Sequence, residues 1–100
     1  MTPRLVLEPA AKQDLAEAFA WYDEHSPGMG SMFLAEVADV LEHIEREPMA
    51  FHLERGDVRK ALVRHFPYVI RFVVLPASIA VIAIFHSRRD PTIWHGRADA

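Results

Sequence analysis

The chain has 100 residues, of which 51% are hydrophobic, 25% are charged and none is cysteine. This length suits one domain with its own core, and the composition argues against disorder. Without cysteine, a disulfide framework and a cysteine-based zinc site are excluded. The longest apolar stretch, residues 72–85, is broken by Pro76 and Ser78. It is shorter than the ~20 residues of a membrane-spanning helix, and no signal segment precedes it. We therefore expect one soluble, cytoplasmic domain over residues 1–100.

Charge is distributed unevenly along the chain, whose net charge is −3. Residues 1–50 carry three Lys/Arg against ten acids, and residues 51–100 carry eight Lys/Arg against four acids. The first half is therefore acidic and the second half basic, which predicts a surface with two faces of opposite sign. A protein dedicated to nucleic acid would usually be basic overall, which this chain is not.

The first half predicts a strand followed by two helices. Residues 4–7 (RLVL) form a short β-type run, and Pro9 suits the first turn of a helix. The breaker cluster HSPGMG at residues 25–30 separates this helix from a second helical pattern over residues 29–44, which Pro48 ends. The apolar residues of the first helix have helical spacing: Ala11, Leu15, Ala18, Phe19 and Tyr22. The two helices should form an antiparallel hairpin.

The second half predicts three strands, at residues 58–64, 68–75 and 79–86, joined by short links into an antiparallel meander. The first of them alternates, and one of its faces carries Val58, Lys60, Leu62 and Arg64. The predicted fold is α+β with the order β-α-α-β-β-β, a helical hairpin packed on a small antiparallel sheet.

The last two strands are apolar on both faces except at Arg71 and His86, so both faces should be covered. The hairpin can cover one face. Either a partner chain, or Phe51 together with the C-terminal tail, can cover the other. The register of the 68–86 hairpin is open at this point, and with it the question of whether Arg71 and His86 share a face.

Motifs for metal binding, nucleophilic catalysis or phosphate binding are not evident, and we expect no metal and no cofactor. The carboxylates of the hairpin have the spacing of solvated helix faces: Asp14, Glu17, Glu36, Asp39 and Glu42.

Basic residues are the more informative group. Five arginines and two histidines lie on or just after neighbouring strands, which run ~5 Å apart. They are Arg59, Arg64, Arg71, Arg88, Arg89, His65 and His86. If they converge on one sheet face, they could hold a phosphate or the acidic side chains of a protein partner. The alternative is internal pairing with the acidic helices.

The segment HSRRDPTIWHGR, residues 86–97, reads as the end of the last strand followed by a docked tail. Asp90 and Pro91 should turn the chain, and Trp94 should pack on the core. Arg88 and Arg89 would then stand at the end of the sheet, available to a partner.

Three stretches together resemble the RelE/ParE superfamily of bacterial type II toxins. They are A..DL.EA..WY at residues 11–22, R..L...FPY.I.F at residues 59–72 and I.V..I.H..RDP..W..R at residues 79–97. The resemblance covers nearly the whole chain, and the first stretch is similar to the first helix of the ParE-like branch. It implies the same β-α-α-β-β-β order. It also implies a cognate antitoxin, of ribbon-helix-helix type, whose C-terminal segment orders as it wraps the toxin in a hetero-oligomer.

The resemblance leaves two activities open. ParE-like members poison DNA gyrase, whereas RelE-like members cut mRNA in the ribosome, for which a base and several cations are needed. Arg88 stands where RelE has its tail arginine, but Trp94 replaces the tail tyrosine and cannot act as an acid or base. Val69 stands where RelE has an arginine. This departure from the RelE pattern favours a ParE-like toxin that acts by binding and not as an enzyme.

Candidate residues differ between these activities. For binding antitoxin or target they are Arg59, Arg64, Arg71, His86, Arg88, Arg89 and Trp94. For the endoribonuclease alternative, His86 would be the base, with Arg88, Arg59 and Arg64 as the cations. A second alternative is a non-toxic relative that only assembles with the antitoxin.

Overall fold

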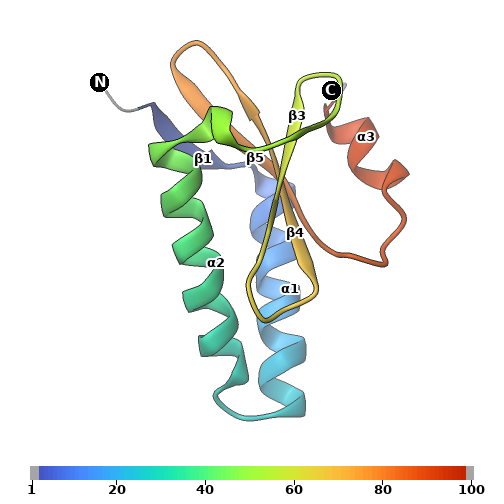
Figure 1. Ribbon diagram of the computed structural model, residues 1–100. Coiled ribbons are helices and arrows are strands. Elements are labelled where there is room, and N and C mark those ends of the chain that lie inside the picture. Colours follow the sequence, from blue (N-terminus) through green and yellow to red (C-terminus); the bar gives the residue numbers. More distant parts are fainter. Residues whose placement is uncertain (1–2, 99–100) are drawn as a thin grey trace.

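The computed structural model describes residues 3–98 (Figure 1). The predicted order of a strand, two helices and three strands is confirmed, and the described residues add a 3-10 turn, η1, the strand β2 and the helix α3. The elements are β1 (Arg4–Leu7), α1 (Pro9–His25), α2 (Met29–Arg46), a 3-10 turn η1 (Pro48–Ala50), β2 (Leu53–Arg55), β3 (Val58–Leu62), β4 (Tyr68–Val74), β5 (Ser78–His86) and α3 (Thr92–Ala98). No helix within residues 3–98 is long and apolar enough to cross a membrane.

The helical hairpin is held at its turn by local chemistry. Oδ1 of Asp23 accepts hydrogen bonds from the backbone N–H groups of Gly28 and Gly30, each at 3.1 Å, which satisfies groups that a helix start leaves unpaired. Gly28 has a φ of 91°, a left-handed conformation that glycine adopts without strain. A Cβ on Gly30 would lie 2.8 Å from Phe19, so glycine here lets the two helices touch.

The sheet has five strands in the order β1-β5-β4-β3-β2, and β1 runs parallel to β5 while the other neighbours are antiparallel. Tyr68 pairs with His86, and Arg71 pairs with Ala83. Because side chains alternate along a strand and Arg71 is three residues from Tyr68, Arg71 and His86 lie on opposite faces. This register answers the question that the sequence left open.

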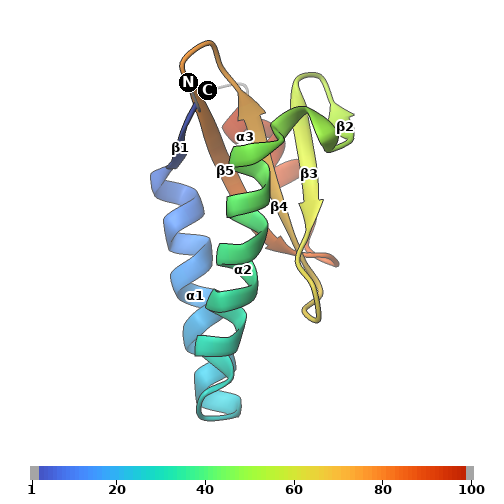
Figure 2. The ribbon, with the colours of Figure 1, turned by 60° about the vertical axis from the view of Figure 1, so that its left-hand side comes forward.

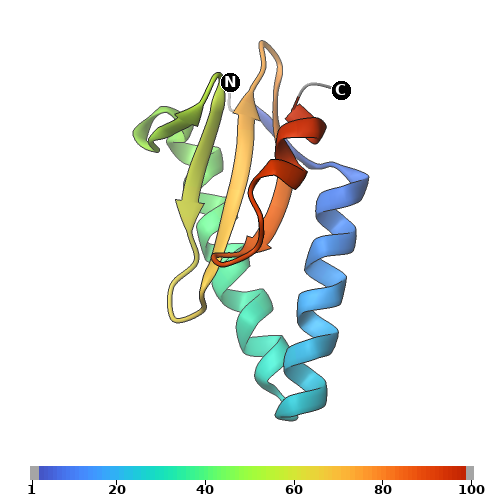
Figure 3. The same cartoon turned by 90° about the vertical axis from the view of Figure 1, so that its right-hand side faces the viewer.

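Each face of the sheet has its own apolar cluster. The hairpin covers one face, where Phe33 and Ile44 of α2 belong to the same apolar cluster as Ile70 and Phe72 of β4. Figures 2 and 3 show α3 on the other side. There α3 packs Trp94, which is 1% exposed, with Val58, Ile82, Ala83 and Phe85. The prediction that Trp94 packs on the core is confirmed. The C-terminal tail covers this face through Trp94. Phe51, which was expected to share this role, packs on the hairpin side of the sheet instead.

Candidate functional site

The predicted basic residues do not converge on one sheet face. Arg71 lies on the α3 face, where its Nε donates to Oε1 of Glu54 at 2.6 Å and its guanidinium carbon lies 5.1 Å from the centroid of the Trp94 ring. Arg59 lies on the hairpin face and donates to the carbonyl oxygen of Phe51 at 2.7 Å. Both guanidiniums therefore have partners inside the fold, which corresponds to the internal pairing considered from the sequence, although Arg71 pairs with β2 and not with the helices.

Glu54 ties β2 to the rest of the sheet. The hydrogen bond from Arg71 lowers the pKa of Glu54, and the charges of Arg71 and Lys60 act in the same direction against the effect of burial. Nζ of Lys60 lies 3.9 Å from Oε2 of Glu54. The three-residue strand β2 was missed in the sequence because LER has no apolar alternation. It is held by this charged contact.

Asp14 is buried, with its side chain 4% exposed, and the prediction that it faces solvent is wrong. Its Oδ2 accepts hydrogen bonds from the backbone N–H of Ile84 at 3.0 Å and from Nη1 of Arg97 at 2.6 Å. Its Oδ1 accepts from Nη2 of Arg97 at 3.1 Å and lies 3.7 Å from Nη1 of Arg89. A buried carboxylate persists only when it is paired and hydrogen-bonded in this way.

This ion pair closes one edge of the sheet. β1 pairs with β5 only as far as Val81, and the chain then turns away into α1. The next edge groups on β5 would be left without partners, but Arg97 Nη1 donates to the carbonyl of Ile82 at 2.9 Å and Asp14 accepts from the N–H of Ile84. Two side chains thus replace the missing strand. Asp14 and Arg97 were not among the candidate residues, because the contact spans 83 positions and only the fold reveals it.

His86 is engaged by its surroundings. Its ring contacts Tyr68 edge-on, with 5.4 Å between centroids, and its Nδ1 accepts a hydrogen bond from the backbone N–H of Arg88 at 3.1 Å. In the neutral ring the proton therefore resides on Nε2, which is a donor and not a base. The Arg88 and Arg64 side chains are exposed in the turns that follow β5 and β3.

Arg59 is remote from His86. Arg59 pairs with Phe72 on β4, and His86 pairs with Tyr68, four residues further along that strand. At ~3.3 Å per residue and ~5 Å per strand, their backbones are about 13 Å apart along the sheet and about 10 Å apart across it. The four residues of the endoribonuclease alternative are therefore not assembled into one cluster.

The hairpin extends past the end of the sheet (Figure 3). A hollow of about 370 Å³ is lined by Trp21, Tyr22, Pro67, Tyr68 and His86. A second hollow of about 220 Å³ shares Trp21, Tyr68 and His86 and continues to Asp14 and Arg89. Burial raises the pKa of both tyrosines, which stay neutral. Trp21 is 53% exposed, and an exposed aromatic beside an arginine is typical of protein-binding surfaces.

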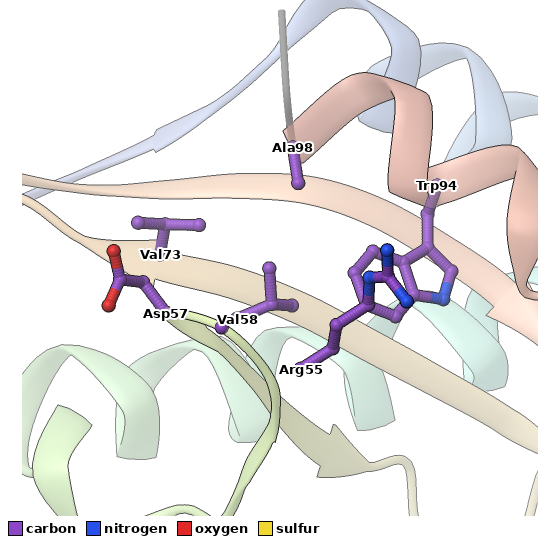
Figure 4. A pocket seen from close by; sticks show the side chains of 7 residues that line it. Arg55, Asp57, Val58, Val73, Trp94 and Ala98 are labelled. Carbon is purple, nitrogen blue, oxygen red and sulfur yellow. The ribbon is translucent and has the colours of Figure 1, made fainter.

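A third hollow, of about 250 Å³, lies between the β2–β3 turn and α3 (Figure 4). Figure 4 shows Val58 between Asp57 on one side and Arg55 and Trp94 on the other. The buried Nε1 of Trp94 has no hydrogen-bond partner within residues 3–98. The charged residues that line this hollow are Asp57 and Arg55.

Comparisons with known proteins agree with one another. A model of the family described as the ParE toxin of the type II toxin–antitoxin system parDE matches residues 5–91. The chain is 27% identical over 92 residues to the toxin ParE2 of Mycobacterium tuberculosis, in strains CDC 1551/Oshkosh and ATCC 25618/H37Rv, covering 91% of this chain and 88% of each relative.

The fold also has a solved counterpart. A chain of the chromosomal ParDE toxin–antitoxin system from P. aeruginosa superposes with a TM-score of 0.76 at 16% identity, covering 85% of this chain and 96% of that one. At this identity the likeness concerns the fold. Since the family model matches most of the sequence, the chain belongs to the ParE toxin family of type II toxin–antitoxin systems.

Proposed function

We propose that this chain is a toxin that acts by binding DNA gyrase, and that it does not cut RNA. The observation that carries this proposal is the state of His86, whose Nδ1 already accepts the N–H of Arg88. A ribonuclease of this superfamily needs a base for the ribose 2′-OH and cations that converge on the phosphate. Here Nδ1 of the candidate base His86 already accepts a hydrogen bond. The candidate cation Arg59 lies elsewhere on the sheet and donates to the carbonyl oxygen of Phe51.

The position of Trp94 gives further support. The Trp94 side chain is buried between α3 and the sheet. An indole cannot give or take a proton at neutral pH. The surface that remains open has the composition of a binding site, with Trp21 and Tyr68 beside Arg89.

A cognate antitoxin of the ribbon-helix-helix class would neutralise the toxin by forming a hetero-oligomer with it. The matched family consists of toxins of the parDE system, and the similar P. aeruginosa chain comes from a ParDE toxin–antitoxin system as well. Both findings support a partner of the antitoxin kind. We place toxin and antitoxin in the bacterial cytoplasm, where gyrase would be within reach.

Two assays on the same purified chain test this proposal. The chain, shown to be folded and able to bind antitoxin, is added to cell-free translation of a defined mRNA and to a supercoiling reaction with purified gyrase. We expect intact mRNA, normal translation and inhibited supercoiling. Cleavage of mRNA within the ribosome would instead establish the endoribonuclease. Activity in neither assay, with no growth arrest on expression, would favour a non-toxic relative.

A double variant separates the two activities. Changing His86→Ala together with Arg88→Ala removes the base and the tail arginine of the endoribonuclease alternative. If the chain cuts RNA, mRNA cleavage in cell-free translation should be lost, and circular dichroism checks that the double variant is folded. Toxicity that persists in the folded double variant supports action by binding.

A further inference from the structure

The two hollows that share Trp21, Tyr68 and His86 form one surface feature, which we call the Trp21 hollow. Tyr22 and Pro67 complete its larger part, of about 370 Å³. The five side chains that line this part include no Lys, Arg, Asp or Glu. A concave surface of aromatic side chains suits a large apolar group of a ligand.

Trp21 is the open part of this wall. It is 53% exposed, and its ring stacks on that of His25 with 3.9 Å between centroids and 22° between planes. The Nδ1–H group of His25 donates to the carbonyl oxygen of Trp21 at 2.7 Å, which fixes the stacked pair within one turn of α1. A ring that is already held in place loses little freedom on binding, and exposed tryptophans contribute strongly to protein interfaces.

The smaller part of the Trp21 hollow, about 220 Å³, contains a cation without a close partner. Arg89 lines it, and its side chain is 39% exposed. The guanidinium carbon lies 4.0 Å from the centroid of the Phe85 ring, which orients the group. Nη1 lies 3.7 Å from Oδ1 of Asp14, beyond hydrogen-bond distance, and no side-chain hydrogen bond of Arg89 is formed within residues 3–98. Its donors are therefore free for a ligand.

Asp14 does not neutralise Arg89, because its charge is already used. Its two oxygens accept hydrogen bonds from Arg97 at 2.6 and 3.1 Å, and Oδ2 also accepts from the N–H of Ile84. One carboxylate thus stands against two guanidiniums, which leaves one positive charge at Arg89. A guanidinium with free donors is suited to bind a carboxylate.

Glu17 lies on the rim of the same hollow and has the opposite charge. It is exposed on α1, and its Oε1 accepts a hydrogen bond from Gln13 at 3.0 Å. The rim position leaves its charge screened by water, whereas Arg89 is fixed on Phe85. The hollow therefore favours an anion beside Arg89, and Glu17 should oppose its binding weakly.

We infer that the Trp21 hollow is the surface of this chain that binds gyrase, and that it receives a gyrase segment in which a large apolar side chain lies next to Asp or Glu. The apolar side chain would pack on Trp21 in the larger part. The carboxylate would accept hydrogen bonds from Arg89 in the smaller part. This inference rests on the proposed function, because it requires gyrase as the target.

Affinity for the purified gyrase holoenzyme, measured by biolayer interferometry, tests the inference. Trp21→Ala should weaken binding at least about tenfold, as the loss of a central interface aromatic commonly does. Met32→Ala is the matched control, because Met32 is 60% exposed on α2 and lines neither part of the hollow. It should change affinity less than about twofold. Circular dichroism and thermal unfolding establish that both variants are folded.

The outcomes separate this inference from the proposed function. If folded Trp21→Ala bound gyrase as tightly as a parent chain that inhibits supercoiling, the hollow would not be the binding surface and the proposed function would stand. If the parent chain itself did not bind gyrase, both would be wrong.

Two charge-removing substitutions test the sign of the bound group. Arg89→Gln removes the cation and should weaken gyrase binding about fivefold or more, whereas Glu17→Gln removes a repulsion and should strengthen it about twofold. Arg46→Gln, at an exposed position in the last turn of α2, is the control and should have no effect. Weaker binding by Glu17→Gln together with tighter binding by Arg89→Gln would overturn the acidic segment. Unchanged affinity in both folded variants would overturn it as well.

Discussion

The two edges of this sheet are treated in opposite ways. Beyond β1, the edge of β5 is closed by Asp14 and Arg97, which hydrogen-bond to backbone groups that lack a strand partner. Beyond β2, no strand within residues 3–98 pairs with the edge of β3 at Leu62, which is exposed. A buried ion pair is an expensive way to close an edge, since both charges must leave water.

The largest effect should come from removing the side chain that holds α3 on the sheet. Trp94→Ala leaves a large cavity under α3, and we expect the free energy of unfolding to fall by about 4 kcal/mol. If α3 detached from the sheet, Arg97 would also lose its contacts at the β5 edge. Chemical denaturation measures the loss. Trp94→Phe is the matched control and should cost less than about 1.5 kcal/mol, because the lost Nε1 has no partner within residues 3–98.

Breaking the closed edge itself should rank next. Asp14→Ala leaves the Arg97 charge and the Ile84 N–H without their partner, for an expected loss of about 3 kcal/mol. Asp39→Ala, at an exposed position on α2, is the control and should stay within about 0.5 kcal/mol of the parent chain. If urea unfolding gave the same small loss for both variants, the Asp14 ion pair would not be what stabilises this edge.

The charged contact that anchors β2 should have a smaller effect, and it depends on pH. The pKa of Glu54 is lowered in the folded chain, first by the hydrogen bond from Arg71. Its contribution to stability is therefore present above the pKa of the unfolded chain and is lost as pH falls through the lower folded value. Glu54→Gln should cost about 1 kcal/mol at neutral pH and reduce the acid-induced loss of stability. Unfolding measured from pH 6 down to pH 3 checks this, and parallel curves would contradict it.

Closing the open edge should change stability least. Leu62→Lys places a charge on an exposed edge position, and we expect a change within about 0.5 kcal/mol in the free energy of unfolding. A substantial loss of thermal stability would mean that Leu62 packs within the isolated chain.

The spacing of apolar residues and the positions of Pro and Gly were sufficient to predict the helical hairpin and the three long strands. Pro9 begins α1 as expected, and Trp94 packs as expected. The elements that were missed, β2 and α3, are short and depend on contacts made elsewhere, through Glu54 and Arg97. A local pattern cannot reveal such contacts.

The site was predicted less completely than the fold. Resemblance gave the superfamily and favoured the ParE-like branch. The grouping of charges depended on register, which separates Arg71 from His86, and on burial, which turns Asp14 from a surface acid into the anchor of two guanidiniums. Neither strand register nor side-chain burial can be read from the spacing of residues in the sequence.

The contact between Asp14 and Arg97 also bears on the order of folding. Closing a loop of 83 residues costs about 4 kcal/mol of chain entropy, so this pair should form after the local hairpins. Until then, burying Asp14 would leave its charge unpaired, and the docking of α1 on β5 should wait for α3. Asp14→Ala should accordingly speed unfolding and leave the folding rate nearly unchanged. A chain in which this pair has not yet formed would expose two open strand edges at once, and at that stage of folding it should be most prone to aggregate.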